Sequence, residues 1–360
     1  MNISSLLRLG LLFALPALAF PAARAQSPSS SAPAPAASAA PSTITLAVQV
    51  ADKSGAPILG LSQSAFTLLD NKKPQSLASF AAINSKSPSP SDPPIEIILV
   101  VDSVNVGPQI VAYERNQIKS FLLRNGGELQ FPVSLIVFND TATRLQNTSS
   151  RDGKALAAFY DQYETGTRVI TPSQGIYGAE DRLDLSLKTL NSIAWYARSV
   201  PGRKLVIWIS PGWPLITGPF IEISDQQQKI VFQSIVTMSD TLRESNVTLY
   251  AVDPLGLTDA GGSWLQYYKD FLKGVPSPSK VQIADLALQV ISVQSGGAVY
   301  NASNNLADSL AKCVSDGAAY YLLTYAPPPA AQPNEYHSLE VKVEAPGATV
   351  RTRTGYYTQP

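Results

Sequence analysis

The stretch Ile95–Asp102 constrains the fold of this 360-residue chain more than any other. It reads I-E-I-I-L-V-V-D, and nearly all of its residues are β-branched or aliphatic. Such a run is typical of a central strand that is buried on both faces of a parallel sheet. The apolar run ends at a carboxylate, Asp102. Because ligands of open α/β sheets bind beyond the carboxyl ends of the strands, the sequence predicts a site near Asp102.

After this stretch, apolar strands alternate with amphipathic helical patterns. Further strands are predicted at 132–138, 205–210 and 247–252, and apolar residues recur at helical spacing in 110–122, 183–197, 231–242 and 283–293. This alternation predicts an α/β fold with a doubly wound, mostly parallel, Rossmann-like sheet and right-handed crossovers. We assign residues 95–316 to this domain.

The segments on either side of the α/β domain have β character. Residues 44–83 and 317–360 each contain short strand-like runs separated by turn residues. Three strands are marginally stable by themselves, so we expect the two segments to pair as one small β-sandwich. The Pro- and Ser-rich segment 84–94 is expected to be a linker, because prolines at this density favour extended backbone.

The N-terminus resembles a secretory signal. Residues 1–25 contain Arg8, a 12-residue apolar run from Leu9 to Phe20, and an A-x-A cleavage motif that ends at Ala25. An uncleaved anchor is the alternative, but the apolar run is short for a membrane span. Residues 26–43 contain only Gln, Ser, Pro, Ala and Thr, a composition that predicts a disordered linker. We therefore expect a secreted or periplasmic protein with no transmembrane anchor after cleavage.

Composition excludes several function classes. The formal net charge is zero, so no basic surplus favours nucleic acid as a partner. One cysteine and one histidine exclude an internal disulfide and Cys- or His-rich zinc sites. A Ser-His-Asp triad would have to use His337, which lies in a strand-like terminal segment. Cys313 shares a helix face with Leu306 and Leu310, which favours a buried thiol over a reactive one.

Several runs, in their order and spacing, resemble the von Willebrand factor type A (VWA) domain, and more narrowly the secreted VWFA-related proteins of Acidobacteria. They are 52–70, I-I-L-V-V-D-S-V-N (97–105), R-K-L-V-I-W-I-S-P-G (203–212), L-Y-A-V-D-P (249–254), S-G-G-A-V-Y (295–300) and 320–356. The resemblance covers nearly all of the chain after the signal. It implies a Rossmann-like sheet with helices on both faces, and a role in binding rather than catalysis.

The resemblance also implies a metal-ion-dependent adhesion site for Mg²⁺ or Mn²⁺ at the top of the sheet. Asp102 matches the first position of the family's D-x-S-x-S motif, but valines occupy both serine positions and Pro211 stands at the final Asp position. The site is thus expected to be degenerate, with oxygens from Asp102, Ser103, Asn105, Thr167 and Ser210. An alternative is structural: Asp102 accepts hydrogen bonds from the first N–H groups of the next helix. For Asp253, which Pro254 follows, a cap or turn is the favoured role.

The predicted function is an exported, non-enzymatic protein–protein interaction or adhesion module that binds a protein ligand. Alternatives are a structural envelope component with no ion site and a metal-assisted hydrolase. Neither G-x-G-x-x-G nor G-x-x-x-x-G-K occurs, which argues against a phosphate cradle for a nucleotide. An aromatic cluster, Trp264, Tyr267, Tyr268 and Phe271, is either a partner-binding patch or an amphipathic cover for the sheet edge.

Overall fold

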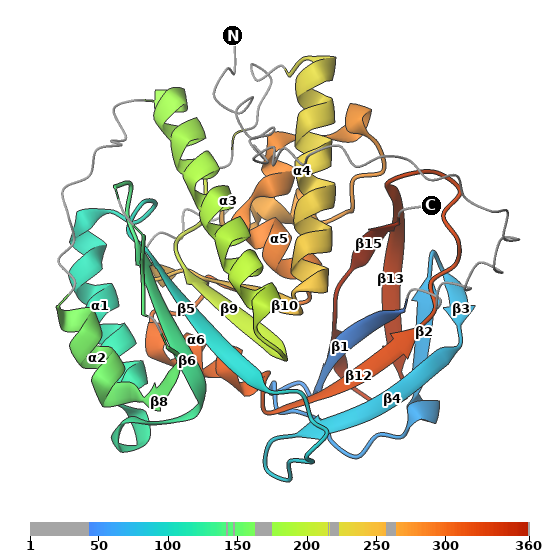
Figure 1. Ribbon diagram of the computed structural model, residues 1–360, viewed down its shortest axis with the longest axis horizontal. Helices are drawn as coiled ribbons and strands as arrows, with labels where there is room; N and C mark the ends of the chain where they lie inside the picture. Colours follow the sequence, from blue (N-terminus) through green and yellow to red (C-terminus); the bar gives the residue numbers. More distant parts are fainter. Residues whose placement is uncertain are drawn as a thin grey trace, which may run out of the picture.

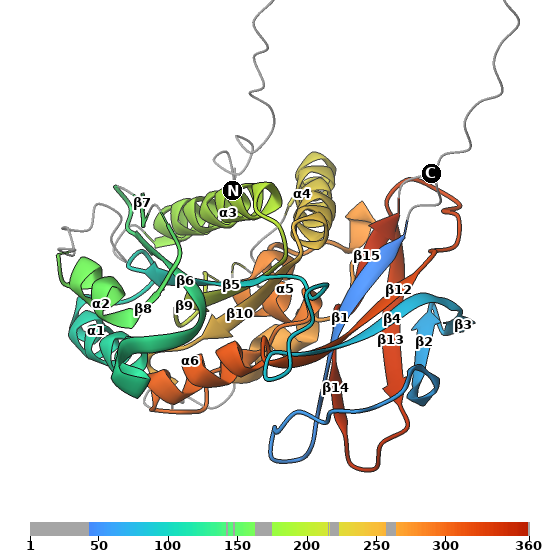
Figure 2. The same ribbon diagram turned by 60° about the horizontal axis from the view of Figure 1, so that its bottom comes forward.

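The computed structural model describes residues 43–141, 143–146, 148–162, 175–214, 216, 223–256 and 264–358. The predicted signal peptide and nearly all of the linker 26–43 lie outside the described residues. The protein consists of an α/β layer structure beside a β-sandwich, and the two views in Figures 1 and 2 show the sandwich at one end of the molecule.

A seven-stranded mixed sheet forms the centre of the α/β part, in the order β11-β10-β9-β5-β6-β7, with β8 paired to β6. The strands are β5 (Ile95–Asp102), β6 (Glu128–Phe138), β7 (Thr143–Leu145), β8 (Ser150–Asp152), β9 (Arg203–Ile209), β10 (Val247–Val252) and β11 (Val299–Tyr300). The long strands run parallel, whereas β7 and β8 run antiparallel to β6. β5 lies between β9 and β6, the central position that its sequence predicts.

Helices cover both faces of this sheet (Figure 2). They are α1 (Pro108–Leu122), α2 (Gly153–Asp161), α3 (Gly175–Ser199), α4 (Asp225–Glu244), α5 (Leu288–Gln294) and α6 (Leu306–Ser315). Alternate residues of β5 point to opposite faces, so Leu99 packs with α1, α2 and α6, while Val100 packs with α3, α4 and α5. Within the described residues, no helix combines the length and apolar character that a membrane span requires.

The two flanking segments pair with each other in two four-stranded antiparallel sheets, β14-β1-β12-β4 and β15-β13-β2-β3. Their strands are β1 (Ile44–Ala51), β2 (Phe66–Asp70), β3 (Lys73–Gln75), β4 (Leu77–Asn84), β12 (Ala319–Tyr325), β13 (Glu335–Val343), β14 (Thr349–Arg351) and β15 (Gly355–Thr358). β1 and β4 both pair with β12, and β2 pairs with β13. One apolar core lies between the sheets and includes Val48, Leu68 and Tyr321, so each flank completes the other.

The helical pattern at 283–293 differs in detail from the expectation. A short 3₁₀ turn, Ile283–Leu286, precedes α5, because Ala287 adopts an extended backbone conformation between them. The aromatic segment η6 (Trp264–Phe271) is also a 3₁₀ helix. Its Tyr268 and Phe271 are buried against the residues before and within α5, which supports the covering role for these two side chains.

Candidate functional site

Asp102 ends β5 and lies on the face of the sheet that α3 covers. Its side chain is 0% exposed, so each carboxylate oxygen needs protein donors. Oδ1 accepts from the backbone N–H groups of Val104 and Asn105, at 2.9 and 3.0 Å. Oδ2 accepts from the Asn105 side-chain amide at 2.8 Å and from the Trp208 indole N–H at 2.9 Å. Four N–H donors thus fill the acceptor sites of one carboxylate.

The N–H groups that Asp102 accepts belong to the loop after β5, and not to the first turn of the next helix as the structural alternative predicts. The donors Val104 and Asn105 belong to the loop that follows β5, whereas α1 begins only at Pro108, which has no N–H. The Asn105 amide also donates to Ser186 Oγ at 3.0 Å. Asp102 therefore joins its own loop to the neighbouring strand β9 through Trp208, and Asn105 joins that loop to α3.

A second buried carboxyl, Glu114, lies near Asp102. Glu114 is 2% exposed on α1, and its Oε1 has no hydrogen-bond partner. Sequence reasoning missed this residue, although a signal was present: Glu114 interrupts the apolar spacing of Val111 and Ile118 on the buried side of the predicted helix. The structure thus places two acids at the top of the sheet where one was expected.

Both carboxyls have raised pKa values. Burial raises the pKa of Asp102, although its hydrogen bonds from Asn105 and Trp208 act in the opposite direction. Burial raises the pKa of Glu114 well above its usual range, and the nearby Asp102 charge raises it further, while Arg115 opposes both. The environment therefore favours a protonated Glu114 beside Asp102.

The remaining predicted site residues are only partly brought together. Ser103 is buried and donates its backbone N–H to the Phe138 carbonyl at 2.9 Å. Ser210, directly after β9, is buried, and its Oγ accepts from the Gly212 N–H at 3.2 Å. Thr167 lies outside the described residues. The valines at the family's serine positions, Val104 and Val106, are both buried.

Those predicted ligands that the structure describes, as arranged, do not fit a divalent ion. Mg²⁺ and Mn²⁺ require an almost complete shell of oxygen lone pairs, whereas both Asp102 oxygens already accept N–H groups. Asn105 Oδ1 is a buried oxygen with no hydrogen-bond partner, and a single amide oxygen is a weak site. Across the described residues, no group of three or more His, Cys, Asp or Glu is placed to hold a metal.

Other chemically interesting residues have structural partners. Asp253 Oδ1 accepts from the Leu255 N–H at 2.8 Å, which is the expected turn. Cys313 is a buried free thiol, and burial raises its pKa well above the usual value. His337 lies inside the sandwich, where its Nδ1 is 2.7 Å from Asp70 Oδ1 and 3.2 Å from the Tyr356 hydroxyl.

Comparison with known proteins gives only weak structural similarity. No family model matches the sequence, and no curated protein matches it. A human COPII-coat protein is 10% identical with a TM-score of 0.34, and the match covers 74% of this chain and 44% of that one. The PilB minor pilin from Streptococcus sanguinis is 10% identical with a TM-score of 0.36, over 64% of each chain. The SpRpn10 VWA domain is 15% identical with a TM-score of 0.26, over 61% of this chain and 94% of that one.

The chain spans less than two thirds of the length of the coat protein and of the pilin. At these TM-scores, the resemblance to VWA domains stays a prediction from the sequence runs.

Proposed function

We propose that the protein is an exported, non-enzymatic protein-interaction module of the adhesion type. The observation that carries this proposal is a pair of exposed aromatic side chains on α3. Tyr177 is 63% exposed and Trp195 is 70% exposed. Trp is usually well buried in folded proteins, whereas Trp and Tyr are enriched among the residues that dominate binding energy at interfaces.

The two aromatic residues lie on the same side of α3. They are 18 positions apart, which is five helical turns or about 27 Å. The ion pair between Asp184 and Lys188, at 2.6 Å, lies between them on this side. We call Tyr177, Asp184, Lys188 and Trp195 the α3 stripe. Two aromatic anchors with charged residues between them suit a protein ligand rather than a small molecule.

The structure of the sheet top supports an interaction that does not use a resident ion. In this proposal Asp102 is the remnant of a metal-ion-dependent adhesion site and now organises the loop after β5. The hydrolase alternative is weakened, because the two carboxyls at this site are 0% and 2% exposed and lie out of reach of a substrate. The closed site also favours the structural envelope component as a second candidate function.

The test is binding of fluorescently labelled residues 26–360, the chain after the expected cleavage, to cells or envelope fractions of the producing organism. We expect saturable binding that unlabelled chain displaces, that EDTA leaves intact, and that is lost or at least tenfold weaker, about 1.4 kcal/mol, in the Tyr177→Ala/Trp195→Ala variant. Leu59→Ala is the matched control, because Leu59 is an exposed apolar residue of the sandwich region. Absence of saturable binding would favour the structural envelope component.

Calorimetric titration of Mg²⁺ and Mn²⁺ tests separately the proposal that the protein binds its partner without a divalent ion. We expect no saturable heat from the wild-type chain, because Asp102 has no free lone pair to offer. Saturable heat that disappears in Asp102→Ala would show a working ion site and would overturn this part of the proposal.

A further inference from the structure

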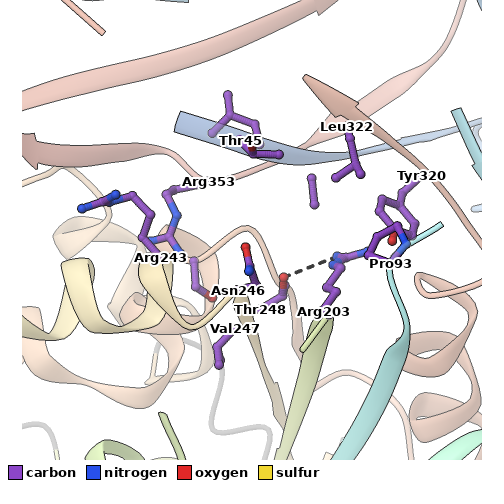
Figure 3. Close-up of a pocket in the computed structure, with 14 residues that line it drawn as sticks. Thr45, Pro93, Arg203, Arg243, Asn246, Val247, Thr248, Tyr320, Leu322 and Arg353 are labelled. Atoms are coloured by element: carbon purple, nitrogen blue, oxygen red, sulfur yellow. Dashed lines mark hydrogen bonds between the residues drawn. The ribbon is translucent and has the colours of Figure 1, made fainter. Parts of the chain in front are cut away.

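A cavity of about 300 Å³ lies at the amino ends of the parallel strands, whereas Asp102 lies at the carboxyl end of β5. It opens between the first residues of β9 and β10 and the outer side of the sandwich strands β1 and β12, represented in Figure 3 by Arg203, Val247, Thr45 and Leu322. Cavities at the junction of two structural units are frequent ligand sites. No part of the adhesion proposal uses this cavity.

Three arginines line this cavity, and none of its other described lining residues is acidic. Figure 3 shows Arg203 on one side and Arg243 with Arg353 on the other, with Asn246 and Thr248 between them. Arginine is the residue that proteins use most for planar oxyanions, because its N–H groups match carboxylate and phosphate geometry.

Arg203 is 5% exposed, yet its partners are all neutral. Its guanidinium donates to the Asp316 backbone carbonyl at 3.2 Å and to the Thr248 hydroxyl at 3.4 Å. It also lies 4.4 Å from the centre of the Tyr320 ring. When the side-chain amide of Gln49 is rotated so that its oxygen faces Arg203, this oxygen accepts from both terminal nitrogens of Arg203, at 3.1 and 2.6 Å. These contacts supply hydrogen bonds but no negative charge, and Nε remains without a partner.

Arg353 is 8% exposed, and within the described residues it forms no direct ion pair. Its Nη1 donates to the Ser239 carbonyl at 3.4 Å. The Asp240 carboxylate acts on Arg353 electrostatically, but its direct ion pair, at 3.2 Å, is with Arg243. Burial and the neighbouring Arg243 charge lower the pKa of Arg353 to about 10, although Asp240 acts in the opposite direction. In the described part of the chain, neither Arg203 nor Arg353 forms an ion pair with a carboxylate.

Asp240 is shared by Arg243 and Arg353, and Arg203 has no direct carboxylate partner among the described residues. Buried cations that exceed their counter-charges are costly, and an anion in the cavity would relieve that cost. The rest of the lining is apolar or carries hydroxyl groups, with Leu322 and Val247 beside Thr45 and Thr248. We propose that this cavity binds a small organic anion, whose carboxylate or phosphate lies between the arginines and whose compact apolar body contacts the sandwich strands. Because the lining comes from both structural units, the ligand also ties the sandwich to the α/β part.

The test is calorimetric titration of benzoate and phenyl phosphate into the full-length chain at constant ionic strength, with benzyl alcohol as the neutral comparison. We expect saturable one-to-one binding of at least one anion and none of the alcohol. The two anions distinguish a carboxylate ligand from a phosphate ligand. Binding should weaken at least tenfold, about 1.4 kcal/mol, in Arg353→Gln, and stay unchanged in Arg124→Gln, whose exposed side chain pairs with Asp308.

A second variant protects the test against a folding defect in Arg353→Gln. Ala47→Leu fills the cavity from β1 without changing any charge, and we expect it to lose binding while it keeps the wild-type circular dichroism spectrum. No heat from either anion at millimolar concentration in the wild-type chain would overturn the proposal. Equal binding by the wild type and a folded Arg353→Gln or Ala47→Leu variant would place the anion elsewhere and overturn it as well.

Discussion

The indole nitrogen of Trp208 fixes the orientation of the buried Asp102 carboxylate. Trp208→Phe removes the 2.9 Å hydrogen bond to Oδ2 and leaves one lone pair of a buried acid unpaired. The lost hydrogen bond should lower the free energy of unfolding by about 1–3 kcal/mol, and the cavity that the smaller ring leaves at this fully buried position adds a packing cost. Urea denaturation measures this loss. Trp195→Phe is the matched control, because that side chain is exposed and should change stability by less than about 0.5 kcal/mol. Equal effects of the two substitutions would contradict a stabilising role for the hydrogen bond from Trp208 to Asp102.

Glu114 predicts the pH dependence of stability. Its folded-state pKa lies well above the usual 4.5, because the side chain is buried and close to Asp102. A raised pKa gives a stability contribution that is complete below the unfolded-state pKa and is lost as pH rises through the folded-state pKa. Glu114→Gln removes this dependence, so the advantage of the wild type over the variant should shrink as pH rises from 4.5. The slope limit is about 1.4 kcal/mol per pH unit.

Denaturation of both proteins across this pH range measures the effect. A stability difference that stays constant with pH would show that Glu114 is ionised equally in the folded and unfolded states, and would contradict the raised pKa.

At the scale of secondary-structure elements, the covering segment η6 makes a testable contribution. Phe271 is buried against the residues around α5 and packs edge-on to Tyr267, with ring centroids 5.3 Å apart. Phe271→Ala should lower the free energy of unfolding by about 3–5 kcal/mol, since it removes apolar contacts and leaves a cavity. Gln266→Ala, on an exposed side of the same segment, should have little effect. A small effect of Phe271→Ala in chemical denaturation would instead favour the partner-binding role of this aromatic cluster.

The elements with strong local patterns could be predicted from the sequence. β5, β9 and β10 are mostly apolar runs, and α3 and α4 have clear helical spacing, so their type did not depend on distant residues. The pairing of the two flanks followed from the instability of three strands alone. The short strands β7 and β8 have no such pattern, because their pairing with β6 determines them.

The site was harder to predict than the elements. Asp102 was found because an apolar strand ends there, but its partner Trp208 lies 106 positions away in the sequence. No local rule connects two residues that meet only when β5 and β9 pair. The proposed anion cavity could not be predicted for the same reason. Arg203 and Arg353 belong to different structural units, and neither forms part of a recognisable motif in its own segment.

For the molecule as a whole, Asp316 connects the α/β part to the sandwich. Its carboxylate accepts from the Tyr250 hydroxyl of β10 at 2.7 Å and pairs with Arg351 of β14. Arg351 also lies 5.7 Å from the centre of the Tyr250 ring. These contacts join strands that belong to separate sheets, so we expect the two parts to unfold as one cooperative unit.

Asp316→Asn tests this cooperativity. The substitution removes the negative charge that Arg351 needs in a largely buried place, and it should lower the free energy of unfolding by about 1–3 kcal/mol. Hydrogen exchange should then accelerate by a similar factor in β10 and in β14, because global unfolding exposes both strands. Asp308→Asn is the control, since it breaks an exposed pair with Arg124 that should contribute less than about 1 kcal/mol. Faster exchange in β14 alone would show that the sandwich opens independently, and the chain would then behave as two units joined by a weak contact.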